Sequence, residues 1–149
     1  GCQEGFRFER LQHWPNAERY GHSMINDFNS GTVGWTDWNV LLDQNGGPNH
    51  VQNFCFAPIH ADTRSDELIY TPIYYYIGHF SKFIKPGASR VSTTASRTTI
   101  QSTSFQNIDG TMVTIFMNSL NQKVAYKLIV GQHEIKLDIE PRAIQSIIY

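Results

Sequence analysis

The stretch GWTDWNVLLDQNGGPN, Gly34–Asn49, decides how the rest of the sequence is interpreted. It places two tryptophans, an aspartate and an asparagine within six consecutive residues and then runs into a Gly-Gly-Pro turn. A tryptophan needs an apolar neighbour for its ring and a partner for its N–H group. Two tryptophans this close together predict a surface on which another flat group can stack.

The tryptophans belong to an expected β-strand. Residues Thr32–Trp38, TVGWTDW, are rich in β-branched and aromatic side chains, a composition that strands favour. Because side chains alternate along a strand, Trp35 and Asp37 lie on one face and Trp38 lies on the other. The two tryptophans are therefore predicted to have different surroundings.

Two amphipathic helices are expected on either side of this strand. Before it, apolar residues recur at helical spacing from Pro15 to Asn29, with proline in the first turn and Asn-Ser-Gly as the end signal. After it, Thr71 can cap a helix that starts at Pro72 and runs to Phe83.

A long loop, Asn39–Tyr70, separates the strand from the second helix. Loops between a strand and a helix usually have about 2–6 residues, so a loop of this length is usually functional. A short strand pair is expected within it at Ile59–Ala61 and Leu68–Tyr70. The glycines and proline of NGGPN would let the loop double back.

From Arg90 onward the sequence predicts an all-β domain. Short runs of alternating apolar and polar residues follow one another, and Asp109-Gly110 is typical of a hairpin turn. This pattern indicates an antiparallel β-sandwich. One strand and two helices cannot close a core by themselves, so we expect more of the first domain to precede Gly1.

Composition excludes several classes of function. Twelve Lys and Arg balance thirteen Asp and Glu, and no basic run could follow a row of phosphates, so nucleic acid is not an expected partner. No apolar run approaches the roughly 20 residues of a membrane helix, so no transmembrane segment is expected. The six histidines show no ligand spacing, and we expect neither a metal ion nor another cofactor.

The sequence contains two cysteines, Cys2 and Cys55. Their spacing matches neither a metal site nor a disulfide framework. We therefore expect two free or packed thiols.

Four motifs follow one another in the chain: GWTDWN, GGPN with NF four residues on, YYYIGHFSKFI and KPGASRV. Together they resemble the C-terminal portion of glucosylceramidases of glycoside hydrolase family 30, and the similarity covers the chain from about Gly1 to its last residue. The resemblance implies an eight-stranded (β/α) TIM barrel joined to a β-sandwich, with a retaining mechanism run by two glutamates.

The resemblance also implies a division of the chain. Residues 1–39 would hold the seventh helix and the eighth strand of the barrel, residues 40–71 a long loop with a small accessory sheet, and residues 72–87 the last barrel helix. Residues 88–149 would form the β-sandwich, which in the family borrows strands from the N-terminal region. The expected fold is α/β plus all-β, the C-terminal part of a TIM barrel followed by an antiparallel β-sandwich.

The catalytic glutamates of the family have no match in this chain. By resemblance, the nucleophile lies immediately before Gly1-Cys2, and the acid/base glutamate lies further upstream. Glu4 is a rival nucleophile, but the resemblance makes it a loop residue, and no partner carboxylate lies at a clear spacing from it. We expect a portion of a retaining β-glycosidase that hydrolyses a β-glucosidic bond and that is inactive by itself.

The resemblance further implies which residues meet the sugar. Trp38 would line the glucose subsite, Asn53 and Phe54 would reach the same cavity from the long loop, and Cys2 and Cys55 would border it. An aromatic platform beside amide groups suits a ring that is apolar on its faces and hydroxylated around its rim.

The opposite face of the strand is expected to support the site without touching the sugar. Asp37 would fix the end of the strand through hydrogen bonds, and Trp35 would pack behind it. The other interpretation is that Trp35 and Trp38 are core aromatics of a buried strand; the residues favour it for Trp35, and the family resemblance favours the sugar subsite for Trp38.

The substrate that the resemblance implies is a β-glucoside or a glucosylceramide-type molecule, and the expected partner is the upstream part of the same barrel. The aglycone stays open, because members of the family cleave ceramide glucosides, aryl glucosides or β-1,6-glucans.

A second interpretation is a non-catalytic carbohydrate-binding β-sandwich formed by residues 88–149. It would need an exposed aromatic platform. The aromatic residues of this part have the spacing of core positions instead: Phe105, Phe116, Tyr126 and Tyr149. A purely structural interaction domain is a third interpretation, and it explains neither the tryptophan cluster nor the long loop.

Overall fold

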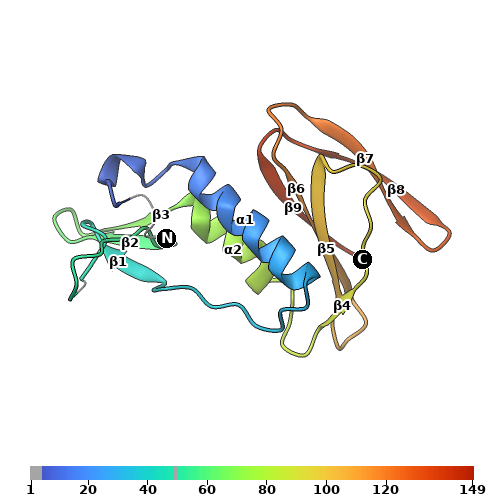
Figure 1. Ribbon diagram of the computed structural model, residues 1–149, viewed down its shortest axis with the longest axis horizontal. Helices are drawn as coiled ribbons and strands as arrows, with labels where there is room; N and C mark the ends of the chain where they lie inside the picture. The colour runs from blue at the N-terminus through green and yellow to red at the C-terminus, as the bar shows by residue number, and fades with distance from the viewer. Residues whose placement is uncertain (1–4, 49) are drawn as a thin grey trace.

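A computed structural model describes residues 5–48 and 50–149 of the chain (Figure 1). Its helices are η1 (Phe8–Arg10), α1 (Trp14–Asn29) and α2 (Pro72–Ser81). Its strands are β1 (Leu41–Asp43), β2 (Ile59–Asp62), β3 (Glu67–Tyr70), β4 (Ser89–Val91), β5 (Ile100–Gln106), β6 (Met112–Asn118), β7 (Val124–Val130), β8 (His133–Ile139) and β9 (Ala143–Ile148).

The two long helices lie side by side in the middle of the molecule (Figure 1). The sheet β1-β2-β3 lies at one end of this helix pair, and the sandwich of β4 to β9 lies at the other. This arrangement is the C-terminal part of a TIM barrel followed by a β-sandwich, so the expected fold class is confirmed.

Both predicted helices form. Helix α1 starts one residue before Pro15 and ends at Asn29, and its buried face includes Ala17 and Ile25. Helix α2 ends at Ser81, two residues earlier than expected. Thr71 occupies its N-cap position, but the Thr71 hydroxyl accepts no hydrogen bond from the helix N–H groups and instead donates to the carbonyl oxygen of Ala57, 3.0 Å away. Thr71 thus fastens the start of α2 to the long loop.

The expected strand Thr32–Trp38 is wrong as a hydrogen-bonded element. In the described part of the chain this stretch is extended coil without ladder hydrogen bonds. A strand exists only beside another strand that accepts and donates its backbone hydrogen bonds. In a closed barrel the neighbours would be two further strands, which residues 5–48 and 50–149 do not provide.

The long loop carries a three-stranded sheet in the order β1-β2-β3. The expected pair at Ile59–Ala61 and Leu68–Tyr70 is confirmed as the antiparallel strands β2 and β3. Strand β1 was not expected, because Leu41–Asp43 is too short to show an alternating pattern. It runs parallel to β2, which returns to it after the turn-rich stretch between them.

The sandwich consists of the four-stranded antiparallel sheet β4-β5-β6-β9 and the hairpin β7-β8. The predicted turn at Asp109-Gly110 joins β5 to β6, with Gly110 at φ 87° and the Asp109 carboxylate accepting the N–H of Thr111. Within the described residues, β7 and β8 pair only with each other, so each has an unpaired outer edge.

Strand β6 is buried on both faces. Val113, Ile115 and Met117 pack in one core with residues of α1 and α2, a contact that we call the helix–sheet interface. Phe116, on the opposite face of β6, packs against Leu128 of the hairpin. The core of the molecule therefore runs from the helices through β6 into the sandwich.

Gly21 allows the close approach at the centre of the helix–sheet interface. A Cβ atom at this position would lie 2.8 Å from the sulfur of Met117 and 2.8 Å from the ring of Tyr76. Any larger residue would push α1 away from β6 and α2.

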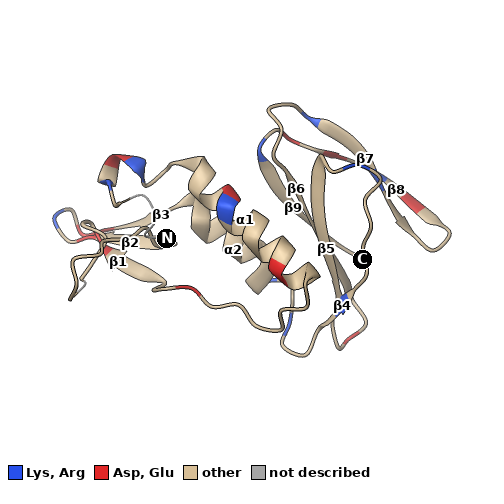
Figure 2. Cartoon of the chain, viewed as in Figure 1, with Lys and Arg blue, Asp and Glu red and all other residues tan. Residues whose placement is uncertain are grey.

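Figure 2 shows lysine and arginine positions scattered along the ribbon of the described residues. None of the helices in the described part is long and apolar enough to cross a membrane.

Candidate functional site

Helix α1 holds the extended stretch that carries the tryptophans. Trp35 donates its indole N–H to the Asp27 carboxylate, with a distance of 3.0 Å between Nε1 and Oδ2. The Tyr20 hydroxyl donates to the Asp37 carboxylate at 2.7 Å, and the Tyr20 and Trp35 rings meet edge to face at 5.8 Å. Trp35 and Asp37 thus both contact α1, as their shared face requires.

Trp38 has very different surroundings. Its side chain is 61% exposed, and its ring makes no aromatic contact with the residues that the structure describes. The ring faces of Trp38 are therefore available to a ligand, whereas Trp35 is partly buried against the main core.

The backbone bends at Trp38 and again at Val40. Asn39 adopts a left-handed conformation with φ 54°, and the Val40 carbonyl accepts the N–H of Ile59 at the start of β2. Asparagine tolerates this conformation better than most residues with a side chain. Trp38 consequently lies between Asp37, which is fastened to α1, and Val40, which is fastened to β2.

The turn after β1 doubles back as its glycines predict. The Asp43 carboxylate accepts the backbone N–H groups of Asn45 and Gly47 at 2.8 and 2.9 Å, and Gly46 has φ 82°. A Cβ atom on Gly46 would lie 2.7 Å from the Cys55 carbonyl oxygen. Only glycine therefore fits where this turn meets the returning chain.

Asn53 and Phe54 lie on that returning chain, and both are exposed. The Phe54 side chain is 39% exposed and makes no aromatic contact within the described part. The backbone directly after them is anchored, because Cys55 donates its N–H to the Gly46 carbonyl at 3.0 Å.

The expectation of two free or packed thiols is wrong, because Cys55 is disulfide-bonded. Its side chain is 1% exposed. Its sulfur lies 3.0 Å from the Asn53 carbonyl oxygen, a close contact, since a disulfide sulfur has no proton to donate. Spacing along the sequence failed here because a loop that doubles back brings distant residues together. Cys2 and Glu4 lie outside the described residues.

His60 locks the base of the loop. Its side chain is fully buried in β2, its Nε2 accepts the N–H of Ala57 at 2.9 Å, and its Nδ1 donates to the Asp43 carbonyl at 2.8 Å. Burial lowers the pKa of the imidazole below its ordinary value. The ring of Phe6 stacks on it at 5.2 Å. Neutral His60 therefore ties both limbs of the turn together.

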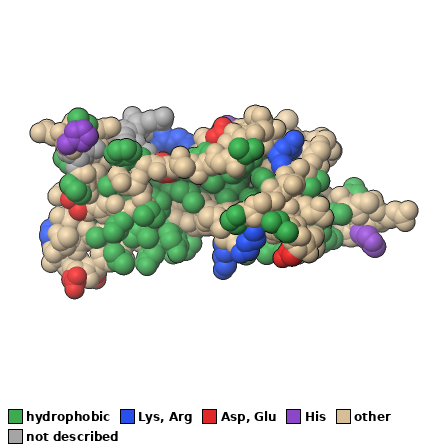
Figure 3. Space-filling view, turned by 90° about the horizontal axis from the view of Figure 1, so that it is seen from below, with side chains coloured by type: hydrophobic (Ala, Val, Ile, Leu, Met, Phe, Trp, Pro, Cys, Tyr) green, Lys and Arg blue, Asp and Glu red, His purple; other side chains and the backbone are tan. Residues whose placement is uncertain are grey.

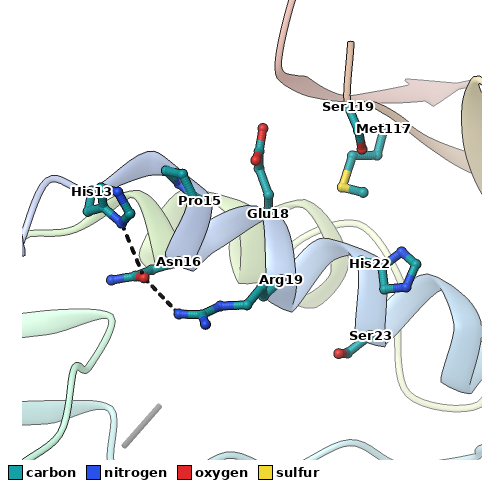
Figure 4. A pocket seen from close by; sticks show the side chains of 9 residues that line it. All are labelled: His13, Pro15, Asn16, Glu18, Arg19, His22, Ser23, Met117 and Ser119. Carbon is teal, nitrogen blue, oxygen red and sulfur yellow. Dashed lines mark hydrogen bonds between the residues drawn. The ribbon is translucent and has the colours of Figure 1, made fainter. Parts of the chain in front are cut away.

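A hollow of about 630 Å³ lies elsewhere, between the first half of α1 and the end of β6 (Figure 4). Its walls include Asn16, which accepts a hydrogen bond from Arg19, and Met117 and Ser119 of the sandwich side. Among the described residues expected to meet a sugar, Trp38, Asn53, Phe54 and Cys55, none lines this hollow.

Glu18, in the wall of this hollow, joins α1 to the sandwich. Its carboxylate forms an ion pair with Arg142, which lies in the turn between β8 and β9. The Arg142 carbonyl oxygen in turn accepts the N–H of Trp14 and the hydroxyl of Tyr76. Burial raises the pKa of Glu18, and the Arg142 guanidinium offsets part of that rise. We assign these contacts to the attachment of the two domains.

The helical half of the molecule also presents an apolar face, where hydrophobic side chains gather (Figure 3). Exposed aromatic residues of β3 and α2 belong to this half, with Tyr74 in edge-to-face contact with both Tyr70 and Tyr75. Contiguous apolar surface of this kind is typical of sites that bind protein, membrane or a ligand.

Two residues of the site were missed from the sequence, Tyr20 and Asp27. Their separation of seven residues places them on the same side of α1, two turns apart, and this spacing was the available signal. In residues 5–48 and 50–149, no group of three His, Cys, Asp or Glu side chains could hold a metal ion.

Comparison with known proteins identifies two domains. The TIM-barrel domain of glycosyl hydrolase family 30 matches residues 3–84, and the β-sandwich domain of the same family matches residues 87–147. The lysosomal acid glucosylceramidase of Mus musculus is 39% identical over 116 residues, which are 77% of this chain and 22% of the mouse protein.

Solved structures agree with this match. SrfJ from Salmonella typhimurium superposes with a TM-score of 0.88 and 33% identity, over 99% of this chain and 32% of that chain. The endo-β1,6-glucanase BT3312 superposes with a TM-score of 0.77 and 26% identity, over 91% of this chain and 33% of that chain. The chain thus spans about a third or less of these relatives. On this evidence of sequence and fold, it belongs to glycosyl hydrolase family 30.

Proposed function

We propose that the chain is part of a retaining β-glycosidase that hydrolyses a β-glucosidic bond of a glucosylceramide-type substrate. The observation that carries this proposal is the exposed ring of Trp38, at the position where the family resemblance implies the end of the eighth barrel strand. In TIM-barrel enzymes the site lies at the C-terminal ends of the strands and is built by the loops that follow them.

In this proposal Trp38 is the platform for the glucose ring, and Asn53 and Phe54 complete the subsite from the long loop. Both loop residues are exposed, which supports a direct contact with the sugar. Cys55 is buried, so it borders the cavity through the loop that it anchors. Asp37 and Trp35 face α1 and take a supporting part.

The two catalytic glutamates are proposed to lie in the polypeptide that precedes Gly1. A retaining mechanism needs a nucleophile and an acid/base group about 5–5.5 Å apart, and the proposed alignment places both upstream. The apolar face of the helical half supports this assignment, because it suits contact with the remaining barrel. The unpaired edges of β7 and β8 likewise suit added strands.

The sandwich provides little support for the alternative of a carbohydrate-binding module. Phe105 and Phe116 are each 6% exposed, and Tyr126 and Tyr149 pack against the core of the hairpin. The exposed large hydrophobic residues of this part are aliphatic: Ile108, Ile129 and Ile148. An aromatic platform for a sugar is thus absent from the described sandwich.

The test compares the 149-residue chain with the chain assembled with the upstream barrel segment. We expect no turnover of an aryl β-glucoside by the chain alone and turnover by the assembly. In the assembly, Trp38→Ala should lower kcat/KM by more than about tenfold, or ~1.4 kcal/mol, whereas Ile129→Ala on the hairpin should leave it unchanged. Turnover by the chain alone that Glu4→Gln abolishes would instead make Glu4 the nucleophile.

The aglycone is tested with the same assembly. Glucosylceramide in detergent and a β-1,6-linked glucan oligosaccharide are compared at equal concentrations. We expect a higher kcat/KM on the glucolipid. Preference for the glucan would reject a glucosylceramide-type substrate while keeping the β-glycosidase assignment.

A further inference from the structure

We propose that Tyr20 and Asp27 of helix α1 are positioning residues that set the orientation of Trp38. The inference rests on the proposed function, because it concerns the ring assigned to the sugar subsite. It adds two residues that lie on the helix, remote from the sugar, and that act through the opposite face of the extended stretch.

The first step is that the stretch carrying Trp38 has few other hydrogen bonds to the rest of the chain. The stretch from Val33 to Trp38 has no ladder hydrogen bonds within the described residues. Within the described residues, its side chains make two hydrogen bonds with α1: Trp35 to Asp27 at 3.0 Å and Tyr20 to Asp37 at 2.7 Å. The position of this stretch is therefore set by helix α1.

The second step is the geometry of the pairing. Moving along α1 from Tyr20 to Asp27, the partners on the extended stretch run backwards, from Asp37 to Trp35. Seven helical residues span about 10.5 Å, whereas two extended residues span about 6.8 Å. The large rings of Tyr20 and Trp35, in contact at 5.8 Å, fill the difference. Two hydrogen bonds in antiparallel order fix both the position of the stretch along the axis of α1 and its rotation relative to α1.

The third step connects these bonds to Trp38. Trp38 follows Asp37 directly and precedes Asn39, with its positive φ, and the Val40 bond to Ile59. Trp38 itself lies at a bend, so the direction of its ring depends on where the backbone of its neighbour Asp37 is held. Loss of the Tyr20 hydroxyl would leave the bond of Trp35 to Asp27 as the nearest remaining hydrogen bond on the N-terminal side of Trp38, three residues away.

The protonation state of Tyr20 suits this task. Burial, followed by the Asp37 carboxylate, raises the pKa of the Tyr20 hydroxyl above its ordinary value. The hydroxyl therefore keeps its proton and donates to Asp37 throughout the range in which proteins work.

The test reads the tryptophans directly in the ¹⁵N-labelled 149-residue chain. The chain contains three tryptophans, and their indole N–H signals can be assigned individually by NMR. Trp14 serves as an internal control, since its indole donates to the Arg142 carbonyl far from the stretch. In Tyr20→Phe, which removes only the hydroxyl, we expect the Trp38 signal to shift and its heteronuclear NOE to fall, while Trp14 keeps both values.

Matched variants separate positioning from a general loss of structure. Asp27→Leu removes the acceptor of the Trp35 indole and should disturb the Trp35 and Trp38 signals. Asp27→Asn and Asp37→Asn keep a carbonyl oxygen that can accept, and should retain most of the wild-type spectrum. Ser23→Ala, an exposed change on the same helix, should change none of the three signals. An unchanged Trp38 signal in both Tyr20→Phe and Asp27→Leu would overturn the inference.

Kinetics in the assembled enzyme distinguish this inference from the proposed function. Tyr20→Phe should lower kcat/KM on an aryl β-glucoside by about fivefold to tenfold, and Asp37→Asn by less, because displaced binding groups reduce rates strongly. If the Trp38 signal moves while Trp38→Ala leaves kcat/KM unchanged, positioning stands and the sugar-binding role of Trp38 fails. If Trp38→Ala lowers kcat/KM but Tyr20→Phe moves neither signal nor rate, the sugar site stands and the positioning role fails.

Discussion

The helix–sheet interface and the stretch that carries the site residues are built in opposite ways. In the interface, Tyr76, Ile115 and Met117 are almost completely buried and contact one another through side chains of this chain alone. In residues 32–54, most side chains are exposed, and a few directional hydrogen bonds hold the backbone. Stability is therefore concentrated in the interface, and the stretch proposed to recognise the sugar contributes little to stability.

The largest effect is expected at the centre of the interface. Tyr76→Ala deletes a fully buried ring and should lower the free energy of unfolding by about 3 to 5 kcal/mol, as other large aromatic deletions do. Urea denaturation followed by circular dichroism measures it. The neighbouring Tyr75→Ala is the control, because Tyr75 is exposed, and its cost should stay below about 1 kcal/mol. Equal costs would contradict the contrast between the two regions.

A smaller effect is expected where the interface meets the sandwich turn. Arg142→Met removes the guanidinium beside the Glu18 carboxylate and leaves that carboxylate buried without its ion partner. Unpairing a fully buried ion costs about 3–5 kcal/mol; because Arg142 is partly exposed, we expect about 1–3 kcal/mol.

The control for this prediction is the double variant Arg142→Met with Glu18→Leu. It removes the unpaired carboxylate and should recover part of the lost unfolding free energy, measured by urea denaturation. A double variant less stable than Arg142→Met would show that the carboxylate is not what destabilises the single variant.

The next prediction concerns the long loop and the dependence of its stability on pH, through the buried side chain of His60. Burial lowers the pKa of folded His60, so the folded protein takes up a proton less readily than the unfolded chain, whose imidazole titrates near about 6.5. Its stabilising contribution is complete above that pH and declines as the pH falls towards the folded pKa, by at most about 1.4 kcal/mol per pH unit.

Unfolding free energies between pH 7.5 and 5 test this slope. Burial also lowers the pKa of His79, so the difference between the wild-type chain and His60→Gln isolates His60. Glutamine can still accept the Ala57 N–H and donate to Asp43, and should flatten the curve. Identical slopes in both proteins would mean that His60 does not lock the loop.

The smallest effect on stability is expected for the most exposed site residue. Trp38→Ala should change the free energy of unfolding by less than about 0.5 kcal/mol, because little of the ring surface is buried in the folded chain. Thermal and urea unfolding both measure it. A loss above about 2 kcal/mol would favour the alternative that Trp38 is a core aromatic.

Local patterns predicted the elements whose partners lie within the chain. The apolar spacing of α1, the Asp109-Gly110 turn and the alternation of the sandwich strands all correspond to formed elements. Thr32–Trp38 has the composition of a strand and still forms no ladder, because strand formation depends on a neighbour that composition does not reveal.

The candidate site was less accessible to sequence reasoning than the fold. The environment of Trp38 followed from alternation together with the family resemblance. The disulfide of Cys55 and the pairing of Tyr20 with Asp37 depend on which distant segments meet in space, and no local pattern records that. The burial of His60 between two backbone partners is of the same kind.

Because β6 is buried on both faces, the seam between the two domains does not coincide with the boundary along the sequence. A chain cut after residue 86 would remove Val113, Ile115 and Met117 from contact with the helices. It would also leave an exposed hydrophobic surface on the sandwich. Neither domain could then be replaced by the corresponding domain of an unrelated protein. Recombination between relatives would have to exchange α1, α2 and β6 together, because these elements share one core.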